Sequence, residues 1–144
     1  MSDYSTLDHA KHNEDVCTHL AENTKYSDWI ITTAFYSAMH YMRYNLFPLT
    51  TKKNGVDVKA NDFDHYCLVM DQVGRKHNVL RKLVEEKAPS DIAAAYNQML
   101  DSSWTARYSR YKFSEKVAKL AKKRLTAIKN HALRENAEAS KVSC

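Results

Sequence analysis

Residues that break regular structure are scarce in this chain of 144 residues, which contains only two glycines and two prolines. A fold built mainly of strands needs many tight turns, and glycine and proline are the residues that most often make them. An all-β architecture is therefore excluded. The abundant alanine, leucine, lysine and glutamate favour helix instead. A chain of this length buries enough apolar surface to fold without disulfide bonds or a structural metal.

Cysteine is also scarce, and the three cysteines (Cys17, Cys67 and Cys144) form no C-x-x-C pair. An odd number without paired spacing is typical of free thiols in a reducing compartment.

Long hydrophobic runs are missing too. The longest weakly charged stretch, residues 29–41, is too short to span a bilayer and contains His40. Because no N-terminal leader pattern is visible either, we expect a cytoplasmic protein without a membrane segment.

Acidic residues are nearly absent from residues 107–131, where nine basic residues stand against Glu115 alone. The whole chain has a formal net charge of +5 and this segment has +8, so the remaining residues sum to −3. A local basic face is typical of a protein that binds a polyanion. A solvated lysine-rich helix without a binding role explains the same pattern equally well.

Apolar periodicity and capping residues predict five helical segments. They cover residues 5–23, 27–47, 62–87, 91–104 and 114–134, with Gly74 as a point where the third can be interrupted. Residues 49–61 are predicted to form a polar loop around an Asn54-Gly55 turn, and residues 135–144 a frayed tail. Short connections imply antiparallel neighbours, so we expect one domain, residues 1–134, with an all-α, up-and-down bundle.

The apolar face of each main helix contains polar side chains that the pattern predicts to be buried. These residues are Asn13, Tyr36, His40, His77 with Arg81 at the edge of its stripe, Arg107, Arg124 and His131. A buried polar group without a partner costs about 1–3 kcal/mol, so we expect these groups to meet in a shared cleft. A histidine near an arginine titrates below about 6.5, which suits acid–base chemistry or anion binding. The alternative for each residue, a structural hydrogen bond to a nearby carbonyl or tyrosine, stays open.

Five segments, in order, resemble the small bacterial HEPN domains: LDHAKHNEDV, SDWIITTAFYSAMHYMRY, KHNVLRKLV, AAAYNQML and SSWTARY, within residues 7–108. The resemblance implies an antiparallel four-helix bundle with a short extra helix, commonly a homodimer. It also implies association with RNA or nucleotides, without a cofactor, in toxin–antitoxin or antiphage-defence systems. The partner protein there would be a nucleotidyltransferase-like antitoxin or another defence component. Many such domains are metal-independent endoribonucleases.

The ribonuclease branches resemble one another in an R-x4–6-H motif, whose arginine binds the scissile phosphate and whose histidine helps proton transfer. Arg124 and His131 have this spacing and fall on one helical face, about 10 Å apart along the axis. However, arginine and histidine are frequent enough to produce the spacing by chance, and this pair sits in the middle of its helix. Arg107 and Arg110 lie where the family's arginine is expected, but neither has a histidine at the required distance.

We therefore predict that His40, the histidine of the F-Y-x-A-x-H helix, faces a polar cleft with His77, Arg81, Arg107 and Tyr108. In this cleft the arginines would hold phosphate and a histidine would orient or protonate it. Asn13 and Tyr36 would support the cleft, and Arg124 with His131 is the alternative catalytic pair. The residues expected to bind RNA or phosphate are Arg107, Tyr108, Arg110, Lys122, Lys123 and Arg124. A structural network that joins the helices is the competing explanation.

A metal site is not expected. His9, His12, Cys17 and His19 are close in the sequence, but helical geometry spreads them over more than about 100°, which is too wide for a tetrahedral ion. No glycine-rich phosphate loop follows a strand pattern either. Two classes of function are left: a metal-independent ribonuclease, and a module that binds RNA, a nucleotide or a partner protein without catalysis.

Overall fold

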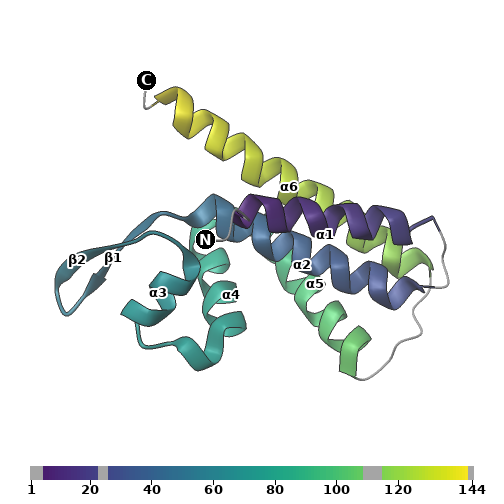
Figure 1. The fold of residues 1–144 in the computed structure, drawn as a ribbon, viewed down its shortest axis with the longest axis horizontal. Coiled ribbons are helices and arrows are strands. Elements are labelled where there is room, and N and C mark those ends of the chain that lie inside the picture. Colours follow the sequence, from purple (N-terminus) through teal and green to yellow (C-terminus); the bar gives the residue numbers. More distant parts are fainter. Residues whose placement is uncertain (1–4, 23–25, 109–114, 143–144) are drawn as a thin grey trace.

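The computed structural model describes the backbone of residues 5–22, 26–108 and 115–142, and the side chains of these residues except 73, 107, 108 and 135–142. This part of the chain is mostly helical, which confirms the predicted helical bundle, but it also contains a two-stranded antiparallel sheet. Figure 1 shows the elements: α1 (Thr6–Leu20), α2 (Ser27–Leu46), β1 (Leu49–Lys53), β2 (Val56–Ala60), α3 (Phe63–Val69), the 3₁₀ helix η2 (Val73–Arg75), α4 (Lys76–Lys87), α5 (Ser90–Tyr108) and α6 (Glu115–Val142).

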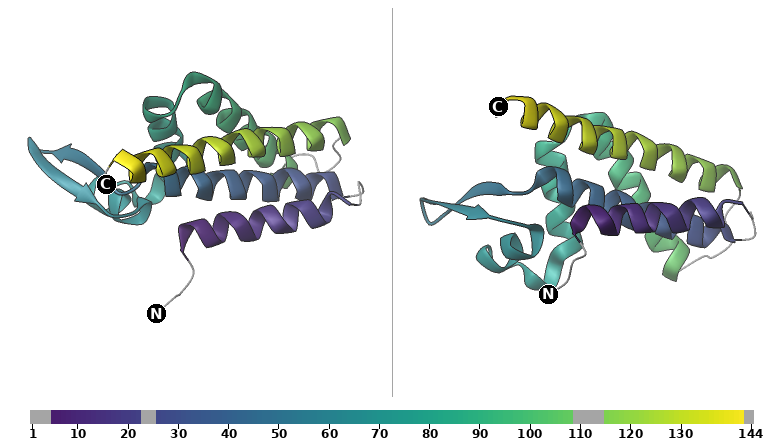
Figure 2. Two further views of the ribbon diagram at one scale, coloured as in Figure 1. Left: turned by 90° about the horizontal axis from the view of Figure 1, so that it is seen from above. Right: turned by 45° about the horizontal axis from the view of Figure 1, so that its top comes forward.

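Helix α2 is the centre of the bundle and packs against α1, α5 and α6. Much of this helix is buried, since Ile31, Ala34, Phe35, Ala38 and Met42 are at most 1% exposed. Figure 2 shows α1 and α6 lying along α2. Small residues such as Ala34 and Ala38 let the neighbouring helices approach closely, so that α2 can pack against three helices at once.

The helix starts follow local capping chemistry. Ser5 caps α1: its hydroxyl accepts from the backbone N–H of Asp8, and the Asp8 carboxylate accepts from the backbone N–H of Ser5. This reciprocal arrangement satisfies two backbone donors that a helix start leaves unpaired. Asp62 caps α3 in a similar way through the backbone N–H of His65.

The polar loop predicted over residues 49–61 is instead a β-hairpin. Strands β1 and β2 pair in the register that joins Leu49 to Ala60 and Lys53 to Val56. Asn54 and Gly55 have φ values of 53° and 80°, which is the left-handed backbone that two-residue hairpin turns require and that Asn-Gly supplies readily. The hairpin projects from the body of the protein beside α3 (Figure 1).

The helix predicted over residues 62–87 is interrupted between Val69 and Lys76, a segment that includes the possible break predicted at Gly74. Asp71 adopts a positive φ of 56°, η2 follows, and α4 begins at Lys76. The apolar stripe continues at helical spacing on both sides of this break, from Phe63 to Val84, so periodicity alone concealed it.

Two further boundaries differ from the predictions. Helix α5 begins at Ser90 and continues to Tyr108, and α6 continues to Val142 rather than ending near Arg134. A helix of this length spans about 42 Å, and its C-terminal end extends away from the bundle in Figure 1. The backbone of residues 135–142 is therefore helical where a frayed tail was expected.

Candidate functional site: a basic cleft between α4 and α5

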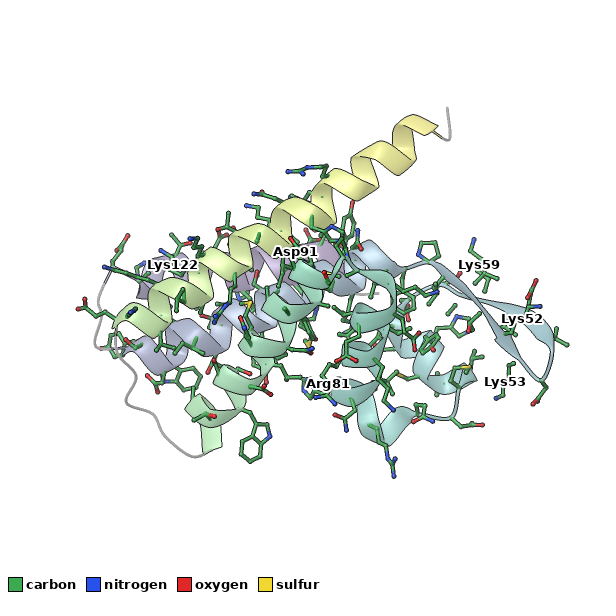
Figure 3. All side chains as sticks on the ribbon, turned by 180° about the vertical axis from the view of Figure 1, so that it is seen from behind. Lys52, Lys53, Lys59, Arg81, Asp91 and Lys122 are labelled. Carbon is green, nitrogen blue, oxygen red and sulfur yellow. The ribbon has the colours of Figure 1, made fainter. Side chains whose placement is uncertain are left out.

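Two of the predicted site residues, His77 and Arg81, line one cleft between α4 and α5. In Figure 3, Arg81 lies where α4 and α5 come close to each other, far from the lysines of the hairpin. The cleft has a volume of about 380 Å³. It is lined by Gly74, Arg75, Lys76, His77, Asn78 and Arg81 on one side and by Leu100, Asp101 and Trp104 on the other.

His77 is exposed, so its predicted core position is wrong. The break before Lys76 starts a new helix whose first residues lie at the protein surface, and His77 belongs to that first turn. The ring of His77 still packs on the core through Phe35, at a centroid distance of 6.1 Å. His77 and Arg81 are four residues apart on one helix, so their side chains share a face, the one that lines the cleft.

The α4 side of the cleft is strongly basic. Arg75, Lys76 and Arg81 supply positive charge and His77 a titratable ring, whereas Asp101 is the one carboxylate in the lining. Helix α4 begins here without an acidic residue in its first turn and without a side-chain cap. The positive end of its dipole therefore adds to the positive potential. Such a combination favours an anion.

The hydrogen bonding of the Arg81 guanidinium is incomplete among the described residues. Its Nε is buried and has no hydrogen-bond partner among the described residues. Arg81 also takes no part in the four ion pairs found in this part of the chain. A guanidinium N–H that is removed from water without an acceptor is costly, and a bound anion would remove that cost.

The side chain of Lys76 is held in place by ion pairs that connect it through Asp64 to Arg43. Its Nζ donates to Asp64 Oδ1 at 2.9 Å, and the other carboxylate oxygen of Asp64 pairs with Arg43 at 3.3 Å. The bond from Lys76, together with the nearby charge of Arg43, lowers the pKa of the Asp64 carboxyl despite its partial burial. Arg43 also lies 5.0 Å from the centre of the Phe63 ring. These contacts tie the start of α4 to α2 and α3.

His40 is not among the residues that line the cleft. Its ring stacks on His9 of α1, with centroids 5.0 Å apart and planes inclined by 22°. Burial, followed by the charges of Arg43 and His9, lowers the pKa of His40 to about 4, so the ring is neutral near pH 7. The predicted meeting of His40 with His77 and Arg81 is therefore not seen. His40 therefore contacts α1.

Three other predicted residues lie wholly or partly outside the described part of the chain. Arg107 and Tyr108 are the last residues of α5, and their side chains are not described. Arg110 falls in the undescribed segment 109–114. Their proposed contacts with phosphate stay predictions.

Of the alternative pair, Arg124 and His131, only His131 lines the hollow beside the start of α5. His131 lines a hollow between the start of α5 and α6, together with Asp91 and Arg134, and Arg124 is not part of that lining. Lys123 lies instead on an exposed stretch of α6 with Lys116 and Lys119, whereas Lys122 is half-buried. The basic surface expected for the last helix is thus present, while its role in RNA binding stays a prediction.

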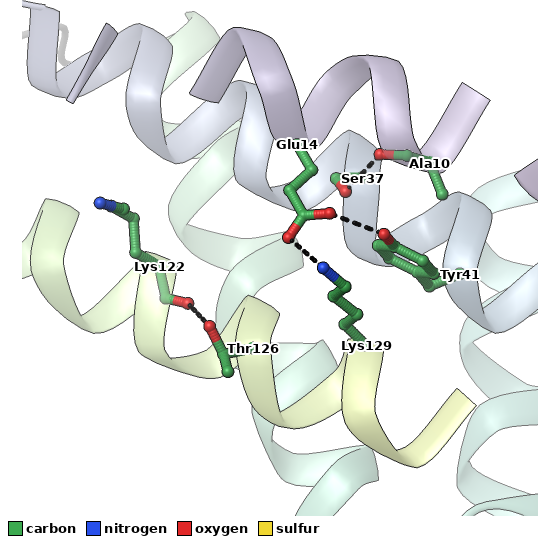
Figure 4. A network of polar contacts seen from close by, with 7 residues as sticks. All are labelled: Ala10, Glu14, Ser37, Tyr41, Lys122, Thr126 and Lys129. Carbon is green, nitrogen blue, oxygen red and sulfur yellow. Dashed lines mark hydrogen bonds and ion pairs between the residues drawn. The ribbon is translucent and has the colours of Figure 1, made fainter. Parts of the chain in front are cut away.

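Asn13 and Tyr36, expected to support the cleft, lie elsewhere. Asn13 Nδ2 donates to the carbonyl of His9 on its own helix, at 3.0 Å, and Tyr36 packs beside Phe35 with ring centroids 5.8 Å apart. Glu14 of α1 connects three helices of the bundle through its hydrogen bonds (Figure 4). Glu14 accepts from the Tyr41 hydroxyl at 2.7 Å and from Lys129 Nζ at 2.9 Å.

This network joins α1, α2 and α6, and sequence reasoning missed it. Burial and then the bond to Glu14 raise the pKa of the Tyr41 hydroxyl, so it stays a donor. Ser37 Oγ adds a bond of 2.7 Å to the carbonyl of Ala10. The available signal was the position of Glu14, four residues after Ala10, on the side of α1 that faces the bundle.

Replacing Glu14 by alanine is expected to lower the free energy of unfolding by about 2 kcal/mol, since the buried Tyr41 hydroxyl loses its acceptor and Lys129 its counter-ion. Asp15→Ala is the matched control, because it removes the neighbouring but exposed carboxylate and should change stability by less than about 0.5 kcal/mol. Urea denaturation followed by circular dichroism measures both. Equal effects of the two variants would show that Glu14 does not connect the helices.

Within the described residues, no group of three or more histidine, cysteine, aspartate or glutamate side chains is arranged to hold a metal ion. No helix in the same part of the chain is both long and apolar enough to cross a lipid bilayer. Comparisons with protein-family models, curated proteins and solved structures gave no match. The site therefore has to be interpreted from its own geometry.

Proposed function

We propose that the protein binds single-stranded RNA, with a phosphate group held in the cleft between α4 and α5. The observation that carries this proposal is the Arg81 guanidinium, whose buried Nε lacks a partner among the described residues, on a wall that also has Arg75, Lys76 and a helix N-terminus. Arginine and backbone N–H groups are the donors that phosphate oxygens prefer. Single-stranded binders commonly combine a basic surface with exposed aromatic rings, and Trp104 at the opposite wall is 55% exposed.

The outer face of α6 extends this proposal. Lys116, Lys119 and Lys123 are exposed and recur at helical spacing, so they form a row along which a backbone of phosphates would be attracted. Such contacts are independent of base sequence. We assign them to the overall affinity for RNA, and we assign the cleft to the positioning of one nucleotide.

The proposal is tested by measuring the affinity for a fluorescent single-stranded RNA over a series of salt concentrations. Binding should weaken as salt increases, and Arg81→Ala should lower the affinity about tenfold and reduce the slope of log affinity against log salt by about 0.7. Lys87→Ala removes one exposed positive charge at the far end of the same helix and is the matched control. If both variants bind RNA equally well, the cleft is not the phosphate site.

A metal-independent endoribonuclease is the second candidate, and the specific observation in its favour is the imidazole of His77 beside Arg81 in one cleft. In such an enzyme the guanidinium would stabilise charge on the phosphate while the histidine transfers a proton. Incubation of total RNA in EDTA distinguishes the two functions. Cleavage that persists in EDTA and is lost in a folded His77→Ala variant favours the enzyme, whereas intact RNA favours binding alone.

The wider setting follows from the resemblance to HEPN domains, which this proposal adopts together with the HEPN arrangement of four core helices. It places the protein in the cytoplasm as a homodimer, in a toxin–antitoxin or antiphage-defence system. A nucleotidyltransferase-like antitoxin or another defence component would be its partner. Co-purification of the tagged protein with the products of neighbouring genes tests this setting.

A further inference from the structure

The α5 wall of the cleft has a chemistry of its own, distinct from the basic α4 wall. Trp104 follows Leu100 by four residues and Asp101 by three on one helix, so its side chain is a neighbour of both, about 5–6 Å away at Cβ. This places an apolar floor, a carboxylate and an indole beside one another. A phosphate would be repelled by Asp101, so this wall is suited to another part of the ligand.

The carboxylate of Asp101 has no structural role among the described residues. Its carboxylate is exposed and takes no part in the ion pairs formed by the described residues, and Thr105 bonds only to its backbone carbonyl. An ionised carboxylate accepts hydrogen bonds through both oxygens and donates none. Beside an exposed indole, such a group is suited to the edge of a stacked base.

Resting on the proposed RNA-binding function, we infer that the cleft selects a guanine base, which stacks on Trp104 and donates its N1–H and N2–H groups to the two carboxylate oxygens of Asp101. Guanine is the one common base whose Watson–Crick edge presents two adjacent donors without an intervening acceptor. Adenine, cytosine and uracil each offer one donor beside an acceptor, which a carboxylate repels. The phosphate of the same nucleotide then points across the cleft to Arg81 and the first turn of α4.

The size of the cleft agrees with this assignment. A volume of about 380 Å³ lies in the range of small-ligand sites and suits one nucleotide rather than a duplex. The Watson–Crick edge is also accessible only in single strands, so recognition by Asp101 excludes paired RNA. The specificity is therefore for an unpaired guanosine within the strand.

The test compares three RNA hexamers that contain five uridines and one central purine: guanine, hypoxanthine or adenine. Hypoxanthine keeps N1–H and lacks the N2 amino group, so it isolates the second hydrogen bond. The wild type should bind the guanine hexamer about tenfold more tightly than the other two. Asp101→Asn should abolish this preference without weakening the binding of the adenine hexamer, because the amide presents a donor to one of the two guanine donors. The adenine hexamer thus also reports that the variant is folded.

The outcomes separate this inference from the function on which it rests. Equal affinity of the wild type for all three hexamers, with every affinity lowered by Arg81→Ala, overturns guanine selection and leaves RNA binding intact. Guanine preference that survives in Asp101→Asn overturns the role of Asp101. Absence of binding to any hexamer overturns both.

Discussion

Replacing Phe35 by alanine is expected to lower the free energy of unfolding by about 3–5 kcal/mol. Phe35 is fully buried at the middle of the central helix α2, and its ring lies 5.6 Å from Tyr96 of α5 and 6.1 Å from His77 of α4. The substitution removes most of an aromatic side chain from a point where three helices meet, and the cavity cannot close without moving one of them. A loss of this size should lower the midpoint of thermal unfolding by about 10 °C or more.

The control for Phe35 is Trp29→Ala, on the same helix. Trp29 is 56% exposed, so its removal should cost about 1 kcal/mol or less although the side chain is larger. Phe35→Leu, which keeps most of the volume, should fall between the two. Differential scanning calorimetry of the three variants measures the effect. A small loss for Phe35→Ala would contradict the central position of α2.

Reversing the charge of Arg75 and Arg81 together, by Arg75→Glu and Arg81→Glu, is expected to lower the affinity for single-stranded RNA by about a hundredfold or more at low salt. The double change removes two cationic groups from the lining of the cleft and replaces them with two carboxylates, which repel a phosphate. The fold should tolerate it, because Arg75 is exposed at the helix start, where an acidic residue is favourable, and Arg81 has no ion pair with a described residue.

The double variant Lys59→Glu and Lys87→Glu controls for net charge. Both lysines are exposed, one on β2 and one at the end of α4, and neither lines the cleft. It alters the total charge by the same amount, so a general attraction to RNA would be weakened equally. We expect a loss of about tenfold or less, and fluorescence anisotropy with one labelled RNA compares the two variants directly. Equal losses would mean that RNA is attracted to the whole surface rather than to the cleft.

The sequence was informative where one local rule acts alone. Helix α1 begins directly after Ser5, close to the predicted start at residue 5, and α5 includes the whole helical segment predicted over residues 91–104. It was misleading where the polar composition of a segment and the pairing of its backbone favour different structures. The exposed positions of the hairpin are mostly polar, with Thr50 and Lys52 on β1 and Asp57 and Lys59 on β2, and this made it resemble a loop until its backbone pairing was known.

The candidate site shows the same limit. His77 and Arg81 were identified as polar residues on an apolar stripe, and the structure does bring them into one cleft, but at the surface. His40 satisfied the same criterion and lies against His9 instead. Which of several buried-looking polar groups meet depends on how the helices are placed relative to one another. The opposite wall, with Asp101 and Trp104, had no sequence signal, because exposed residues on a helix are usually only solvated.

The most direct test of RNA binding in the cleft uses the two tryptophans as reporters, since Trp104 lines the cleft and Trp29 does not. Trp29→Phe leaves Trp104 as the only tryptophan, and Trp104→Phe leaves Trp29. Titration with single-stranded RNA should quench the emission of Trp104 in the first variant, because a base stacks on the indole, and leave that of Trp29 in the second unchanged. Quenching of Trp29 with unchanged emission from Trp104 would contradict binding between α4 and α5.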